Sequence, residues 1–210
     1  MHILLTNDDG VSARGIGILE EVMSVHADKV TVVAPVGQRS AASHSMSINK
    51  DLYCQEIESN YPNVRKFSVN GTPVDCVKTA LEFFLADDMP DLIISGINDG
   101  YNLGSDVLYS GTVSAAMEGP YYQMPAIAVS IGKLTEVRGY ETAGLVVEII
   151  DRVIVGGKFP GILNVNVPGK KGKISIDNVV VVPQAVQIYR NVILQERSRR
   201  SDMLSRRWGQ

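Results

Sequence analysis

The adjacent carboxylates Asp8 and Asp9 are the residues of this sequence with the clearest chemical potential. They follow the apolar run His2–Thr6 directly and precede Gly10. Two like charges held this close are unfavourable unless a cation or a shared proton compensates them, and hard cations such as Mg²⁺ prefer carboxylate oxygens. The pair therefore predicts a divalent-cation site with both aspartates catalytic, although an isolated Asp-Asp-Gly is also typical of a helix cap or a turn.

Two further polar segments offer neutral oxygen ligands. Ser40 lies in the segment after the second expected strand, and Asn98 lies in the segment after the expected strand that ends at Ser95. Each residue alone is an ordinary loop residue. In open α/β sheets, however, ligands bind beyond the carboxyl ends of the parallel strands, so these segments should meet. Ser40 and Asn98 then complete an all-oxygen metal site with the two aspartates.

The segment Ser110-Gly111-Thr112 opens a helical pattern of small residues. A helix N-terminus offers unpaired backbone N–H groups and the positive end of the helix dipole, which suits a phosphate group. Simple N-capping is the alternative interpretation, and it is compatible with anion binding. The predicted substrate- and phosphate-binding residues are Asn7, Gly10, Ser43, Asn102, Ser110, Gly111 and Thr112. His44 lies near these loops and is a possible proton donor, although a structural role is favoured because the sequence indicates no partner for it.

Short apolar runs alternate with helical patterns along the chain, which predicts an α/β fold with a mostly parallel sheet covered by helices. The expected strands span residues 2–6, 30–34, 92–95, 126–130 and 163–167, and the expected helices span residues 15–26, 112–122 and 140–155, with a further helix starting at Thr72-Pro73. Polar alternation over Ser47–Val69 predicts an inserted β-hairpin. After Pro168 the pattern becomes strand-like, at 179–182 and 188–194, without a helical crossover. We therefore expect a catalytic core over residues 1–168 and a C-terminal extension over residues 169–210.

Composition excludes several classes of protein. The 210 residues are 45% hydrophobic and 20% charged, with a formal net charge of −3, so no global field favours nucleic acid or an anionic membrane. Neither G-x-G-x-x-G after the first strand nor G-x-x-x-x-G-K-[ST] occurs, which argues against a dinucleotide cofactor and a P-loop NTPase. The N-terminus lacks the features of a signal peptide, and no apolar run approaches the ~20 residues that span a bilayer. We expect a soluble, cytoplasmic protein.

Several ordered motifs together resemble the SurE family of stationary-phase survival nucleotidases. The matching segments, which cover about residues 1–170, are Asn7-Asp8-Asp9-Gly10, Ala34-Pro35 with Ser40 and Ser43, Asn70-Gly71-Thr72-Pro73, Ser95-Gly96-Ile97-Asn98, Asn102-Leu103-Gly104, Tyr109-Ser110-Gly111-Thr112-Val113 and Leu163-Asn164-Val165-Asn166-Val167-Pro168. As a set they are far more specific than any one of them.

The resemblance implies a Rossmann-like three-layer α/β/α core and phosphomonoesterase activity on nucleoside 5′- and 3′-monophosphates. It also implies one divalent cation per subunit, Mg²⁺ or Mn²⁺, held by Asp8, Asp9, Ser40 and Asn98. The chain would form a homodimer or homotetramer, with residues 169–210 as the oligomerisation arm and without a stable nucleic-acid partner. A non-catalytic nucleotide- or phosphate-binding module is the alternative, but carboxylates that face an anion gain nothing without a metal.

Overall fold

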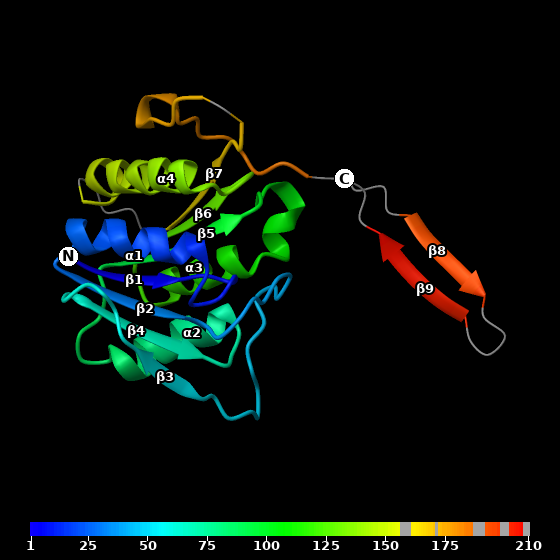
Figure 1. Ribbon diagram of the computed structural model, residues 1–210, viewed down its shortest axis with the longest axis horizontal. Helices are drawn as coiled ribbons and strands as arrows, with labels where there is room; N and C mark the ends of the chain where they lie inside the picture. Colours follow the sequence, from blue (N-terminus) through cyan, green and yellow to red (C-terminus); the bar gives the residue numbers. More distant parts are fainter. Residues whose placement is uncertain (156–160, 171, 187–191, 198–201, 208–210) are drawn as a thin grey trace.

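A seven-stranded sheet forms the centre of the computed structural model, which describes residues 1–155, 161–170, 172–186, 192–197 and 202–207 (Figure 1). The strands are β1 (His2–Thr6), β2 (Lys29–Pro35), β3 (Cys54–Ile57), β4 (Val64–Val69), β5 (Leu92–Asp99), β6 (Ala126–Ile131) and β7 (Ile162–Val167). Their order across the sheet is β3-β4-β2-β1-β5-β6-β7. Every neighbouring pair is parallel except β3 and β4, which are antiparallel. The predicted parallel sheet and its hairpin are both confirmed.

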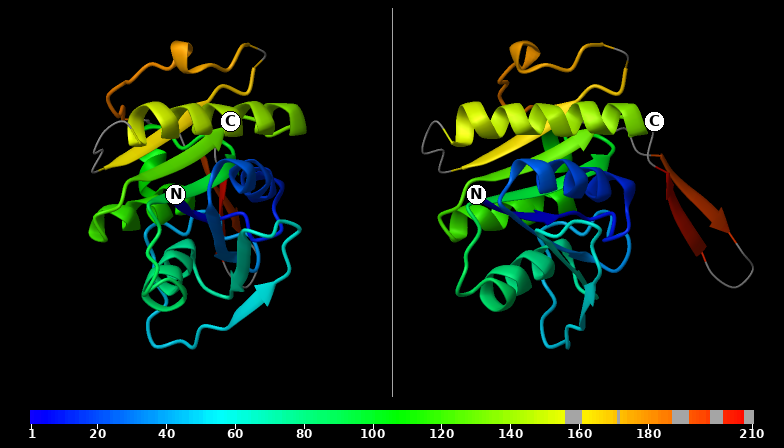
Figure 2. Two further views of the ribbon diagram at one scale, coloured as in Figure 1. Left: turned by 90° about the vertical axis from the view of Figure 1, so that its left-hand side faces the viewer. Right: turned by 60° about the vertical axis from the view of Figure 1, so that its left-hand side comes forward.

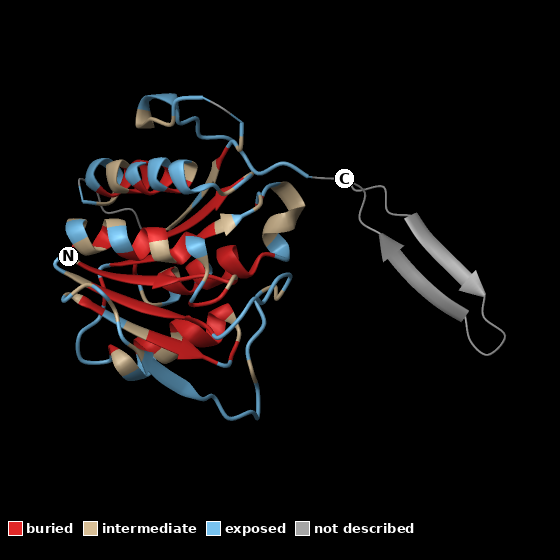
Figure 3. Cartoon of the chain, viewed as in Figure 1, coloured by how far each residue is buried: buried red, intermediate tan, exposed pale blue. Residues whose placement is uncertain are grey.

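Helices cover both faces of the sheet and make three layers (Figures 1 and 2). Helices α1 (Arg14–His26) and α4 (Glu136–Ile149) pack on one face, and α2 (Pro73–Thr79) and α3 (Gly111–Tyr121) pack on the other. Successive residues of a strand point to opposite faces, so Ile3 and Leu5 join the α1–α4 cluster while Leu4 joins the α2–α3 cluster. Buried residues line the sheet and the inner helix faces in Figure 3, and the expected α/β/α architecture is confirmed.

Local signals explain where the helices begin. The Thr72 hydroxyl accepts the Asp75 N–H, and the Asp75 carboxylate accepts the Thr72 N–H, so a capping box opens α2. Helix α4 begins at Glu136, four residues before the predicted start, because the Thr135 hydroxyl caps it by accepting the N–H of Arg138. A π-helical turn, Ile150–Ile154, continues α4 to one residue before the predicted end.

The structure corrects two expectations from the sequence. Strand β5 continues to Asp99, with a register shift against β6 between Ser95 and Asn98, so Asn98 lies within the strand and not in the loop after it. Residues 179–182 form no strand, and these four exposed valines pair with no strand in the part of the chain that the structure describes. The described part of the C-terminal region instead contains an antiparallel hairpin, β8 (Val192–Arg197) and β9 (Asp202–Arg207). The expected strand at 188–194 overlaps β8 over 192–194, and its residues 188–191 lie outside the described residues.

Among the described residues, no helix is both long enough and apolar enough to cross a bilayer. The cytoplasmic location inferred from the sequence remains a prediction.

Candidate active site

The predicted site residues gather where the strand order reverses. Strand β1 lies between β2 and β5, and the chain builds the sheet outward from this point in both directions. The carboxyl edge at such a switch point is the usual ligand site of open α/β sheets. The Arg39 N–H donates to the Asp8 carbonyl at 2.7 Å, and the Asp99 N–H donates to the Asp9 carboxylate. The segments after β1, β2 and β5 therefore meet, as the sequence predicted.

The loop that carries the aspartates is closed by Asn7, which is 1% exposed. Its Nδ2 donates to the Gly10 carbonyl at 2.9 Å, and its Oδ1 accepts the Gly10 N–H at 3.1 Å. Gly10 has a φ of 106°, and a Cβ there would lie 3.0 Å from the Gly37 Cα. Asn7 and Gly10 thus shape the loop and hold the aspartates in position.

Asp8 is the most buried carboxylate of the site, at 6% exposure. Its Oδ1 accepts the Thr112 hydroxyl at 2.5 Å, and the carboxylate also accepts the Thr112 backbone N–H at the start of α3. Burial raises the pKa of Asp8 to about 6, the Thr112 hydrogen bond opposes this shift, and the charge of Asp9 adds to it. A Cβ on Gly111 would lie 2.8 Å from the Asp8 Cβ, so only glycine lets α3 approach this close.

Asp9 is partly exposed, and burial is the main cause of its raised pKa. The N–H of Asp99 and the Gln38 side chain lower this pKa by hydrogen bonding, while the Asp99 charge raises it. The sequence indicated no role for Asp99 or Gln38, although Asp99 ends β5 and Gln38 lies in the loop after β2. Burial disfavours the ionised form of both aspartates. A cation bound between them would compensate both negative charges, so this pair of carboxylates suits a cation site.

Asn98 and Ser40 are the neutral residues predicted to complete the metal site. The Asn98 Nδ2 donates to the Gly100 carbonyl at 2.9 Å, which leaves Oδ1 without a hydrogen-bond partner in the described part of the chain. Ser40 is exposed in the loop after β2, next to Arg39, whose N–H donates to the Asp8 carbonyl. The described residues contain no group of three or more His, Cys, Asp or Glu side chains that could hold a metal. A site here would therefore depend on neutral oxygens beside the two aspartates.

The residues predicted to contact phosphate make hydrogen bonds within the protein. The Ser110 hydroxyl accepts the Val113 N–H at 3.1 Å and caps α3, while Thr112 contacts Asp8. The Ser43 hydroxyl donates to the Leu108 carbonyl at 2.7 Å, which joins the loop after β2 to the segment before α3. These contacts fix the walls of the site, and direct contact with phosphate remains a prediction.

Asn102, 8% exposed, anchors the segment between β5 and α3. Its Nδ2 donates to the Ser130 hydroxyl at 2.7 Å, and its N–H donates to Asn166 Oδ1 at 2.9 Å. Its carbonyl accepts the amide groups of Asn164 and Asn166. The network ties the predicted substrate loop to the ends of β6 and β7.

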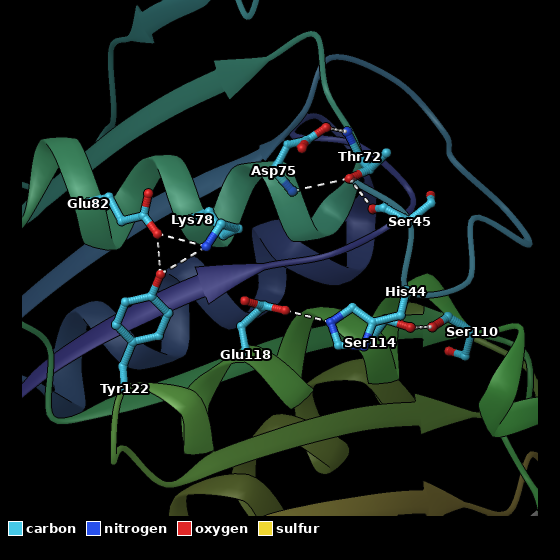
Figure 4. Close-up of polar contacts among 10 residues, drawn as sticks. All are labelled: His44, Ser45, Thr72, Asp75, Lys78, Glu82, Ser110, Ser114, Glu118 and Tyr122. Carbon is cyan, nitrogen blue, oxygen red and sulfur yellow. Dashed lines mark hydrogen bonds and ion pairs between the residues drawn. The ribbon is translucent and has the colours of Figure 1, made fainter. Parts of the chain in front are cut away.

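His44 has a partner that the sequence did not indicate. Its Nε2 lies 2.5 Å from Oε1 of Glu118, which is 6% exposed on α3 (Figure 4). In the sequence, Glu118 stands out only as the charged residue in a helix of small and apolar residues. That pattern does not identify His44 as its partner. Tertiary packing alone joins these residues, which are 74 positions apart.

Comparisons with known proteins agree with this architecture. Residues 3–191 match the family described as survival protein SurE. A 5'-nucleotidase SurE of Clostridium botulinum (strain Kyoto / Type A2) is 52% identical over 130 residues, which cover 62% of this chain and 50% of that protein. A 5'-nucleotidase SurE of Legionella pneumophila (strain Lens) is 47% identical over 171 residues, which cover 80% of this chain and 64% of that protein.

The crystal structure of the SurE protein from Aquifex aeolicus superimposes with a TM-score of 0.82 at 32% identity, covering 99% of this chain and 82% of that chain. The chain thus spans between about half and two thirds of the length of the curated relatives that it matches. The family match extends beyond residue 170, where the resemblance found in the sequence ended. The chain belongs to the survival protein SurE family.

Proposed function

We propose that this protein is a metal-dependent phosphomonoesterase that hydrolyses nucleoside 5′- and 3′-monophosphates to nucleoside and phosphate. The observation that carries the proposal is the buried Asp8 carboxylate beside Asp9, at the point where three strand-end loops converge. Relatives that bear the name 5'-nucleotidase SurE support the nucleotide substrate. Because the chain covers only 50% and 64% of these two relatives, their activity is extended to it as a proposal.

Asp8, Asp9, Ser40 and Asn98 would hold one divalent cation, Mg²⁺ or Mn²⁺. Such a cation supplies Lewis-acid stabilisation of the charge that develops on a phosphoryl group. The Thr112 hydroxyl and N–H keep Asp8 oriented, and an oriented ligand is worth about 10- to 100-fold in metal affinity or activity.

Asp9 is the more exposed of the two aspartates, so we assign to it the contact with the attacking group. It either takes a proton from a water that attacks phosphorus while the P–O bond to the nucleoside breaks, or it displaces the nucleoside itself and forms an acyl-phosphate, which water then hydrolyses to phosphate. Trapping of a labelled acyl-phosphate on the protein would decide for direct attack. Ser110, Gly111 and Thr112, at the start of α3, are assigned to the remaining phosphate oxygens together with Asn7, Gly10, Ser43 and Asn102.

We also propose that residues 169–210 serve assembly into a homodimer or homotetramer. In support, β8 and β9 pair with each other and lie outside the seven-stranded sheet. Sedimentation of the full chain, compared with a chain that ends at residue 186, would test this role. Equal sedimentation coefficients after correction for mass would contradict it.

The test of the activity is phosphate release from a panel of nucleoside 5′- and 3′-monophosphates. The protein is first stripped with a chelator, and Mg²⁺ or Mn²⁺ is then added back. Release that returns with metal supports the proposal. A folded protein that releases no phosphate with either ion overturns it, and ligand-induced thermal stabilisation without product would then indicate a non-catalytic binding module.

A further inference from the structure

A pocket of 630 Å³ lies between α2 and α3, next to the candidate active site. We call it the α2–α3 pocket. Its apolar and aromatic walls are Met46, Val74, Tyr121 and Tyr122. Three polar side chains, described below, complete the lining. The pocket is open toward solvent, and its volume lies within the range of small-molecule sites.

Two segments connect this pocket to the aspartates. Helix α3 carries Thr112, which contacts Asp8, and Glu118, which lines the pocket. These residues are six positions apart, so at 1.5 Å per residue they are separated by about 9 Å along the helix. The loop after β2 carries Ser40 at the predicted metal site and His44 at the pocket. A substrate whose phosphate lies at the aspartates therefore has its remaining part within reach of the pocket.

Two hydrogen bonds to the start of α2 hold the loop that forms the outer wall directly after His44, and Figure 4 shows the first of them. The Thr72 hydroxyl donates to the Ser45 carbonyl at 2.8 Å, and the Ser47 N–H donates to Asp75 Oδ1 at 2.9 Å. Thr72 and Asp75 are also the capping box of α2, so the start of this helix anchors the wall. A wall fixed before the ligand arrives lowers the entropic cost of binding.

The charges in the pocket already have partners within the protein. His44 pairs with Glu118 at 2.5 Å, and the Lys78 Nζ lies 2.7 Å from Glu82 Oε1 and 3.2 Å from the Tyr122 hydroxyl. Figure 4 shows both groups on the facing sides of α2 and α3. No unpaired cation is left in this lining to attract a second phosphate group. The pocket therefore suits a neutral ligand group.

One acceptor remains open in the lining. The Oε2 atom of Glu118 has no hydrogen-bond partner among the residues that the structure describes. A carboxylate accepts hydrogen bonds from the exocyclic amino group of a nucleobase. Tyr121 and Tyr122 add aromatic faces, on which any base can stack.

We propose that the α2–α3 pocket binds the nucleobase of the substrate and that Glu118 favours bases that carry an amino group. This inference rests on the proposed nucleotidase activity and names the part of the substrate that the pocket recognises. It assigns no chemical step to the pocket residues.

The test compares kcat/KM for adenosine monophosphate, inosine monophosphate and ribose 5-phosphate. We expect Tyr121→Ala to lower kcat/KM for adenosine monophosphate about tenfold through lost stacking, and to leave kcat/KM for ribose 5-phosphate within about twofold. Phe83→Ala is the matched control, because Phe83 and Tyr121 are both 76% exposed and Phe83 does not line the pocket. Glu118→Gln should reduce the preference for adenosine over inosine monophosphate by about tenfold, since a neutral amide accepts the amino group less strongly and can donate to inosine instead.

Titration calorimetry of adenosine into the metal-free protein separates this proposal from the proposed activity. Adenosine should bind the wild-type protein and should bind Tyr121→Ala more weakly, whether or not the protein hydrolyses any phosphate ester. If the wild-type protein hydrolyses none of the three esters, the proposed activity fails while the binding result still tests the pocket. Equal losses for adenosine monophosphate and ribose 5-phosphate in Tyr121→Ala, or adenosine binding that is unchanged by this substitution, would overturn the pocket assignment.

Discussion

Replacing Asp8 with asparagine is expected to stabilise the metal-free protein while removing its activity. The Asp8 pKa is raised from 3.8 to about 6, chiefly by burial, so the folded protein binds the proton of this carboxyl group more tightly than the unfolded chain does. A shift of about two pKa units corresponds to roughly 3 kcal/mol, at 1.36 kcal/mol per unit. Ionising Asp8 in the folded protein, when no cation is bound, therefore lowers the free energy of unfolding by about this amount.

The sign of the pH dependence follows from the raised pKa. Below pH 3.8 the carboxyl group is protonated in both states, and no cost is present. The cost develops as the pH rises from 3.8 to about 6, and it is fully present above that range. Asparagine cannot ionise, and its Oδ1 can still accept the hydroxyl of Thr112. Asp8→Asn should therefore exceed the wild-type free energy of unfolding by up to about 3 kcal/mol at pH 8 without metal, and by little at pH 4.

Urea unfolding in the presence of a chelator, at pH 4 and at pH 8, measures both differences. Mn²⁺ at about 1,000 times its Kd should reverse the order at pH 8, since it would stabilise the folded state by about 4.1 kcal/mol and only the wild type should bind it. Asp87→Asn, which removes an exposed carboxylate, is the control for net charge. The reasoning is refuted if metal-free Asp8→Asn is less stable than the wild type at pH 8, or if Mn²⁺ stabilises both proteins equally.

Three further predictions concern the support of the site. Gly111→Ala should reduce activity at least tenfold in the phosphate-release assay, because the added Cβ would lie 2.8 Å from the Cβ of Asp8. Gly144→Ala is the control: a Cβ there would meet nothing within 4 Å, so activity in the same assay should be unchanged. Thr112→Val should weaken Mn²⁺ binding about 10- to 100-fold, because it removes the hydroxyl that donates to the Asp8 carboxylate. Thr112→Ser keeps a hydroxyl and should restore the affinity. Equal Mn²⁺ affinities for the two variants in a calorimetric titration would count against this prediction. Lys66→Met should lower the free energy of unfolding by about 3–5 kcal/mol, because it leaves the buried Glu20 carboxylate, 2.6 Å from the Lys66 Nζ, without its cation. A loss below about 1 kcal/mol in urea unfolding would show that the ion pair is not effectively buried.

The sequence predicted the core of the fold because the signals there are local. His2–Thr6 is a continuous apolar run, and the strand has these bounds in the structure. Thr72-Pro73 carries the chemistry of a helix start, and α2 begins there. The convergence of the strand-end loops followed from the rule for parallel sheets, and the hydrogen bond between Arg39 and Asp8 agrees with it.

The remaining features depend on tertiary contacts that no local pattern contains. Strand β5 runs beyond Ser95 because β6 continues to pair with it after a register shift, so periodicity could not place Asn98 within the strand. The partner of Thr112 at Asp8 lies 104 positions away, and the sequence predicted a phosphate contact at Thr112 without indicating this bond. The valines at 179–182 have high strand propensity but pair with no strand among the described residues, so propensity alone does not make a strand.

The central claim is that one divalent cation, held by Asp8 and Asp9, is required for phosphate release. The most direct measurement determines Mn²⁺ stoichiometry and phosphate release together, on chelator-treated wild type and on the Asp8→Asn and Asp9→Asn variants. The account predicts one Mn²⁺ per wild-type chain and the joint loss of high-affinity binding and of turnover in both variants. A variant that keeps near-normal turnover, or one that loses turnover while it still binds one Mn²⁺ with unchanged affinity, would contradict it.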